Sequence, residues 1–180
     1  MAADSPYAVS KLAGDQLADL YGRSFGLDIV RFRPFFWIGP RKAGDVASDI
    51  ARRIVDIERG APPLLKIGRT DTVRDMIDVE DGVTALLLLA ERGLAGSAYN
   101  ICCGRGTSIA QLIAEFRAQA RVSFDVEQDV TLLRPIDELV KIGDPARIVA
   151  LGWSPRETLD QSVAAILDYW RGAAGIRPAS

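Results

Sequence analysis

Tyr7 and Lys11, near the start of the chain, have the residue types and the spacing of an acid/base pair. Residues four apart on a helix lie on the same face about one turn apart, so the two side chains can meet. A phenol normally loses its proton at about pH 10, and a nearby ammonium group lowers a phenol's pKa because it stabilises the phenolate. The pair could therefore donate or accept a proton, although the same spacing also describes a tyrosine packed beside a solvated lysine.

Other reactive groups are few. The chain contains no histidine, and its two cysteines, Cys102 and Cys103, are adjacent. The lack of imidazole excludes Ser-His and Cys-His nucleophile systems and the usual zinc sites, and we predict no metal site. Neighbouring cysteines cannot easily meet disulfide geometry, and we expect small buried apolar side chains rather than reactive thiols.

The composition is that of an ordinary globular domain. Of the 180 residues 48% are hydrophobic and 26% are charged, and the net charge of -2 gives no basic field to hold a polynucleotide. The longest apolar stretch, residues 83–90, is far shorter than the roughly 20 residues of a membrane helix, and the N-terminus lacks a signal-peptide apolar region. We therefore predict a cytoplasmic protein with no nucleic-acid or membrane partner.

Alternating helices and strands must position the reactive residues, and this alternation predicts an α/β protein. Ser5-Pro6 has the pattern of an N-cap followed by proline at the first helical position, and helical spacing of apolar residues continues to Gly26. Residues 35–45 are expected to form a loop because they contain Gly-Pro and Ala-Gly steps. Further helices are expected at 46–59, 81–92, 108–120, 144–150 and 158–170, and strands at 27–32, 64–67, 72–79, 97–102 and 122–126.

The segment Ser5 to Gly14 resembles the active-site helix of extended short-chain dehydrogenases, the NAD-dependent epimerase/dehydratase family. Similar motifs follow in the family's order and spacing over about 170 residues. They are Arg33-Pro34-Phe35, Ile38-Gly39-Pro40, residues 73–79, Tyr99-Asn100-Ile101, Arg134-Pro135 and Gly152-Trp153-x-Pro155. Within that family the chain is most similar to GDP-6-deoxy-mannose reductases and GDP-mannose 4,6-dehydratases.

The resemblance implies roles for individual residues at the reacting centre. Tyr7 would donate a proton to a sugar oxygen or accept one from it. Lys11 would hold the nicotinamide ribose of NAD or NADP and stabilise the ionised phenol. Pro34 and Phe35 would lie beside the nicotinamide carboxamide.

Two arginines, Arg74 and Arg134, match positions where the similar enzymes bind the nucleotide diphosphate. A guanidinium suits this role because its planar donors can bind two oxygens at once. The alternative for each arginine is a surface or structural ion pair. Asp75 and Asp78 are expected to fix the local backbone or to pair with arginine rather than to act in catalysis.

Phe36 and Trp37 stand where the family pattern usually has Asn-His. The change removes an amide and an imidazole from the predicted substrate site and introduces two aromatic faces. The two rings either stack on a ligand ring or belong to the core.

The family's glycine-rich loop, which seats the cofactor pyrophosphate on a helix N-terminus, has no counterpart here. Gly104-Arg105-Gly106 follows an expected strand but is too short for that fingerprint. We therefore expect the C-terminal part of an extended short-chain dehydrogenase. Residues 1–34 would end a Rossmann-like domain with an incomplete parallel sheet. Residues 35–171 would form mainly the small α/β substrate-binding region, with some segments returning to that sheet, and 172–180 a tail.

The activity that the resemblance implies for the complete enzyme is an NAD(P)-dependent reduction, dehydration or epimerisation of a nucleotide sugar. The expected substrate is a GDP-linked deoxyhexose, and the expected assembly is a homo-oligomer. The competing hypothesis is a non-catalytic remnant that binds a nucleotide sugar or a partner protein without turnover.

Overall fold

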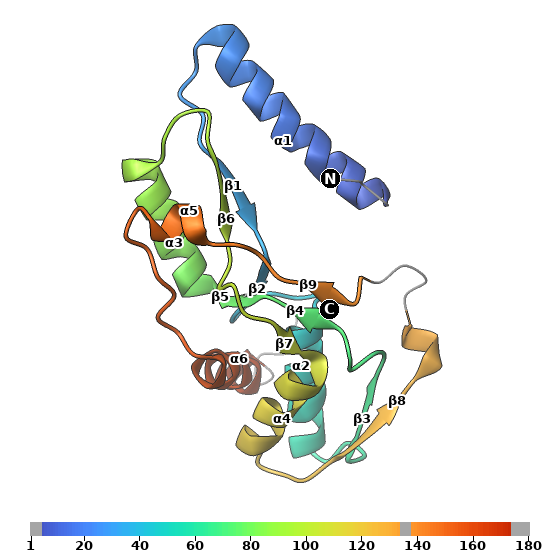
Figure 1. Cartoon of the computed structure of the whole chain (residues 1–180). Coiled ribbons are helices and arrows are strands. Elements are labelled where there is room, and N and C mark those ends of the chain that lie inside the picture. Colours follow the sequence, from blue (N-terminus) through green and yellow to red (C-terminus); the bar gives the residue numbers. More distant parts are fainter. Residues whose placement is uncertain (1–4, 134–137, 174–180) are drawn as a thin grey trace.

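The computed structural model describes residues 5–133 and 138–173, which form an α/β fold and confirm the predicted class (Figure 1). The helices are α1 (Pro6–Phe25), α2 (Val46–Glu58), α3 (Val79–Arg92), α4 (Ile109–Gln119), the short 3-10 helix η1 (Val130–Leu132), α5 (Ala146–Val149) and α6 (Leu159–Ala173). The strands are β1 (Arg31–Pro34), β2 (Phe36–Ile38), β3 (Leu64–Ile67), β4 (Val73–Arg74), β5 (Met76–Asp78), β6 (Ala98–Ile101), β7 (Thr107–Ser108), β8 (Asp125–Gln128) and β9 (Val140–Lys141). No helix in the two described ranges is long and apolar enough to cross a membrane.

The first helix, α1, begins and ends where its sequence predicts. The Ser5 side chain accepts a hydrogen bond from the Ala8 backbone N–H, and Pro6 occupies the first turn. Gly26 ends the helix with a φ of 66°, a left-handed conformation that glycine adopts without strain. No residue of α1 is buried, and in Figure 1 the helix extends along one side of the molecule, next to β1.

The strands pair in four small groups. β1 is parallel to β6, β2 to β5, and β3 to β8, whereas β4 lies between antiparallel β7 and parallel β9. These pairs join segments far apart in the sequence, such as Phe36 with Met76 and Leu64 with Asp125. The sheets therefore bring the segments on either side of α2 and α4 together.

Two predicted strands are displaced in the structure. The strand expected at 27–32 begins only at Arg31, because its pairing with β6 starts opposite Ala98. The strand expected at 122–126 begins at Asp125, where pairing with β3 starts. In both cases a distant partner, rather than the local apolar run, determines which residues are extended.

Two further segments also differ from prediction. Residues 35–45, expected to be a loop throughout, contain β2, a strand of three residues that is too short to show a clear alternating pattern. The strand expected at 72–79 is divided at Asp75 into β4 and β5, which belong to different sheets. The division turns the Asp75 side chain into the interior, where it is fully buried.

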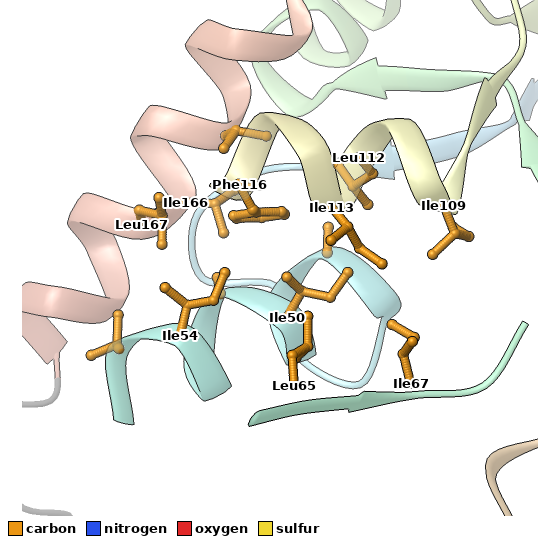
Figure 2. Close-up of a cluster of buried hydrophobic side chains, with 14 of the residues drawn as sticks. Ile50, Ile54, Leu65, Ile67, Ile109, Leu112, Ile113, Phe116, Ile166 and Leu167 are labelled. Carbon is orange, nitrogen blue, oxygen red and sulfur yellow. The ribbon is translucent and has the colours of Figure 1, made fainter. Parts of the chain in front are cut away.

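The main hydrophobic core lies between α2, α4, α6 and β3 (Figure 2). The side chains labelled there are Ile50, Ile54, Leu65, Ile67, Ile109, Leu112, Ile113, Phe116, Ile166 and Leu167. A second cluster packs α3 and α5 against β6 and includes Ile77, Ala85, Leu89, Tyr99, Ile101, Ile148 and Trp153. The first core fixes α2 against β3, and these two elements frame the cavity described next.

Candidate functional site

A cavity of about 340 Å³ lies between α2, β3 and β4. Four cationic side chains and two carboxylates line it together with apolar groups. The cations are Arg53, Lys66, Arg69 and Arg74, the carboxylates are Asp45 and Asp49, and the apolar residues include Phe36, Ile50, Leu65 and Leu132. This combination suits a ligand that carries both an anionic group and a flat apolar group.

Arg74, one of the two predicted diphosphate ligands, lines the cavity. Its Nη1 atom donates hydrogen bonds to the carbonyl oxygens of Val73, at 2.9 Å, and Glu138, at 2.7 Å. These bonds hold the guanidinium between β4 and the segment that leads to β9. Arg134, the second predicted diphosphate ligand, lies outside the described residues.

The other cations interact with neighbouring groups, of which only the Lys66 carbonyl oxygen belongs to a cavity-lining residue. Arg53 donates a hydrogen bond to the carbonyl oxygen of Lys66. The Lys66 ammonium lies 3.9 Å from Glu127, and Arg69 forms a two-point pair with Asp71 at 2.9 and 2.6 Å. The positive charge of the cavity is thus partly ordered by the protein itself.

The aromatic residues Phe36 and Trp37 point to opposite sides of β2, because successive side chains of a strand alternate. Phe36 lines the cavity, and the Lys42 ammonium lies 4.9 Å from its ring centroid. Trp37 packs toward α3, where a Cβ added to Gly82 would stand 2.8 Å from the indole ring. The indole Nε1 is buried and has no hydrogen-bond partner within the described ranges. The structure thus gives Phe36 a cavity position and Trp37 a core position.

Tyr7 and Lys11 lie side by side on α1, as their spacing predicts. The Lys11 Nζ atom is 5.4 Å from the centroid of the Tyr7 ring, and Tyr7 is 73% exposed. A phenol with this exposure can reach a ligand, and the neighbouring ammonium can hold a polar group beside it. Neither residue lines the cavity that contains Phe36 and Arg74.

Pro34 ends β1, and Phe35 follows it. The Phe35 N–H donates a hydrogen bond of 3.1 Å to the carbonyl oxygen of Ile101, which extends the pairing of β1 with β6 by one residue. The Phe35 ring packs on Gly143, where an added Cβ would stand 2.6 Å from the ring edge. Contact of Pro34 and Phe35 with a nicotinamide stays a prediction.

An ion-pair network around Asp15 holds α1 to β1. Arg33 donates two hydrogen bonds to the Asp15 carboxylate, at 2.9 and 2.7 Å, and Arg31 donates a third at 3.1 Å. Arg31 also lies 2.9 Å from Asp19. The hydrogen bonds from Arg33 lower the pKa of Asp15 below its ordinary value, although burial opposes the shift. The network therefore sets the position of the helix that carries Tyr7.

The carboxylate of Asp75 fixes two loops. It accepts hydrogen bonds from the backbone N–H groups of Cys103, at 2.7 Å, Gly104, at 2.9 Å, and Gly143, at 3.1 Å. Asp78 caps α3 and accepts a hydrogen bond of 2.6 Å from the Ser162 hydroxyl. The predicted backbone-fixing role of both aspartates is confirmed.

The two cysteines also behave as predicted. Cys102 is fully buried and Cys103 is partly buried. Burial, with the Asp75 charge as the next cause, raises the pKa of Cys102 to about 12 and that of Cys103 to about 11. Both thiols therefore stay protonated at neutral pH, which makes them poor nucleophiles.

Comparison with known proteins decides the family. Residues 1–102 match the family described as NAD dependent epimerase/dehydratase. The chain belongs to this family. It is 37% identical over 169 residues to GDP-6-deoxy-D-mannose reductase of Pseudomonas aeruginosa, an alignment that covers 92% of this chain and 56% of the relative.

Solved structures of other epimerase/dehydratase proteins share the fold. RMD from Pseudomonas aeruginosa, complexed with NADPH, has a TM-score of 0.85 and 36% identity over 93% of this chain and 56% of that chain. UDP-glucose 4-epimerase of Thermotoga maritima, with UDP-glucose, has a TM-score of 0.81 and 26% identity over 94% of this chain and 54% of that chain. The chain thus spans slightly more than half the length of the relatives it matches, and its Rossmann-like fold assignment is confirmed.

The sequence did not single out several of the residues that line the cavity. Asp45, Asp49 and Arg53 recur every four residues, a spacing that places them on one face of α2. That spacing was the available signal. Lys66 and Arg69 gave no comparable signal, because they reach the cavity only through the packing of β3 against α2.

Proposed function

We propose that this chain carries the substrate-binding region and the Tyr7–Lys11 helix of an NAD(P)-dependent nucleotide-sugar reductase, dehydratase or epimerase. The observation that carries the proposal is the cavity, where four cations, two carboxylates and the ring of Phe36 surround about 340 Å³. A nucleotide sugar offers a diphosphate to the cations and a flat base to the apolar wall. The similarity to GDP-6-deoxy-D-mannose reductase favours a GDP-linked deoxyhexose as the substrate.

Arg74 is the proposed ligand of the diphosphate. Its guanidinium is already oriented by the carbonyl oxygens of Val73 and Glu138, so little side-chain entropy is lost when a phosphate binds. Phe36 lies in the same cavity and offers a ring face to the base or the sugar. Arg134 stays a proposed second ligand on the strength of the family motif alone.

The proton step is assigned to Tyr7. The residue is exposed and its ring lies beside the Lys11 ammonium, an arrangement that fits the ribose and nicotinamide end of NAD or NADP. When bound, that cofactor would exchange a hydride with a sugar carbon. Tyr7 would give a proton to the sugar oxygen or take one from it, while Lys11 would bind the ribose hydroxyls. Pro34 and Phe35 would border the nicotinamide.

A second candidate is a protein that binds a nucleotide sugar without turnover. The observation that favours it is that the whole cavity is formed by residues of this chain, none of which belongs to the proposed Tyr7–Lys11 pair. Both candidates predict that the purified chain binds GDP-mannose in calorimetric titrations. Both also predict that the chain alone does not bind NADPH with a low-micromolar dissociation constant.

A chimera separates the two candidates. The part of the Pseudomonas aeruginosa reductase that this chain does not cover is fused ahead of Ser5. Consumption of nicotinamide cofactor with a GDP-linked keto-deoxyhexose would support the enzyme. A chimera that binds both ligands without turnover would support the binding protein, and failure of the chain to bind any nucleotide sugar would contradict both.

A further inference from the structure

We infer that Asp49 selects guanine as the base of the bound nucleotide, an inference that rests on the proposed function of the cavity. Asp49 lies in the first turn of α2 and lines the cavity. Its side chain is exposed, and no hydrogen bond or ion pair reaches its carboxylate from any residue in 5–133 or 138–173. The cavity therefore holds a carboxylate whose acceptor capacity is not used by any residue that the structure describes.

The second carboxylate of the cavity is already occupied. Asp45 caps α2, accepting hydrogen bonds from the N–H groups of Ala47, at 2.9 Å, and Ser48, at 3.1 Å. It also accepts a hydrogen bond of 3.2 Å from the Ser48 hydroxyl, and its carboxylate lies 3.4 Å from the Lys42 ammonium. Asp45 thus serves the helix terminus, whereas Asp49 is available to a ligand.

The hydrogen-bonding edge of guanine fits this carboxylate. Guanine presents its N1–H and its exocyclic amine side by side, so two carboxylate oxygens can accept both donors. Uracil presents one N–H between two carbonyl oxygens, and these oxygens would repel a carboxylate. Hypoxanthine keeps the N1–H but lacks the amine, so it would lose one of the two bonds.

The neighbours of Asp49 complete the match. Arg53 stands one turn further along α2 on the same face, where its guanidinium is held by the Lys66 carbonyl oxygen. The guanine edge carries the O6 acceptor next to the N1–H and amine donors. A cation beside a carboxylate can therefore donate to O6 while the carboxylate accepts from the two donors. Accessible apolar surface for the base comes from two other lining residues, Leu132, which is 43% exposed, and the partly exposed Phe36. Arg74, on β4, remains the proposed ligand of the diphosphate.

Calorimetric titration of the purified 180-residue chain with nucleoside diphosphates tests the inference. Wild type should bind GDP at least tenfold more tightly than inosine, uridine or xanthosine diphosphate, because the charge-assisted pair is available to guanine alone. Xanthine carries a carbonyl oxygen in place of the guanine amine. Asp49→Asn should therefore weaken the binding of GDP and strengthen the binding of xanthosine diphosphate, since the new amide can donate a hydrogen bond to that oxygen.

Asp56→Asn is the matched control, because it makes the same change of charge on an exposed residue of α2 that does not line the cavity. It should bind all four nucleotides as wild type does. Equal affinity of wild type for GDP and UDP would overturn the role of Asp49, and so would an equal loss of affinity for all four nucleotides in Asp49→Asn. Either result would leave the proposal of a nucleotide site standing. If wild type binds no nucleoside diphosphate at millimolar concentration, the proposed function fails as well.

Discussion

Arg33 holds the carboxylate of Asp15 through two hydrogen bonds, one of 2.9 Å from Nε and one of 2.7 Å from Nη2. The pair ties the helix that carries Tyr7 to the strand that ends at Pro34. Because α1 has no buried residue, apolar packing alone does little to hold it. The position of the proposed acid/base pair thus depends on a charged contact.

Asp15→Asn should loosen α1. We expect the free energy of unfolding to fall by about 1–2 kcal/mol, because charge-assisted hydrogen bonds are lost at a partly exposed site. Hydrogen exchange of the α1 amides should quicken in the same variant. Asp56→Asn, an exposed site on α2, is the control, and unchanged exchange in α1 would show that other contacts hold the helix.

Two carboxyl groups predict how stability depends on pH. Hydrogen bonds from Arg33 lower the pKa of Asp15 below its ordinary value of 3.8, and those from Arg171 lower the pKa of Glu58 below 4.5. A carboxyl group with a lowered pKa stabilises the folded state above its unfolded pKa, and this contribution is lost as pH falls through the folded value. The free energy of unfolding should therefore decrease below about pH 4.5.

Denaturant titrations at stepped pH measure this decrease. Glu58→Gln should be less stable at neutral pH and should lose less stability on acidification, because one of the titrating groups is gone. The same acid slope in wild type and variant would count against the assignment.

Arg74→Ala should weaken binding of GDP-mannose by about 1.5–3 kcal/mol, the contribution of a charge-assisted hydrogen bond. The fold should survive, because Arg74 is a partly exposed residue of a two-residue strand. Calorimetry with Arg92→Ala, an exposed arginine in the last turn of α3, gives the control. Equal affinity for GDP-mannose in the two variants would show that Arg74 does not bind the diphosphate.

Tyr7→Phe should lower turnover of the chimeric enzyme by roughly 10² to 10⁴, the usual contribution of a positioned acid/base group. Tyr21→Phe removes another exposed hydroxyl from the same helix and should leave turnover unchanged. Near wild-type turnover in Tyr7→Phe would exclude the assignment of the proton step.

The exposed apolar face of α1 predicts self-association of the chain. Its apolar side chains Val9, Leu17, Leu20, Tyr21 and Phe25 are between 47% and 67% exposed. Contiguous exposed apolar surface favours association. Size-exclusion chromatography with light scattering should show an oligomer that Leu17→Glu shifts toward monomer and that Val149→Glu, on α5, does not. A monomeric wild type would contradict the prediction.

Local patterns determined the elements that depend on neighbours in sequence. The Ser5 cap, Pro6 and Gly26 bounded α1, and four-residue spacing placed Tyr7 beside Lys11. These contacts lie within a few residues of one another, so one stretch of sequence contains all the information. The ordered series of family motifs likewise indicated the epimerase/dehydratase family that the comparisons show.

The tertiary structure alone decided which strands form and which side chains meet. β2 exists because Phe36 pairs with Met76, forty residues further along the chain. That pairing places Phe36 at the cavity and Trp37 in the core. Lys66 joins Asp49 in one cavity only because β3 packs on α2. Such contacts depend on segments distant along the chain, and neither residue type nor periodicity specifies which segments will pair.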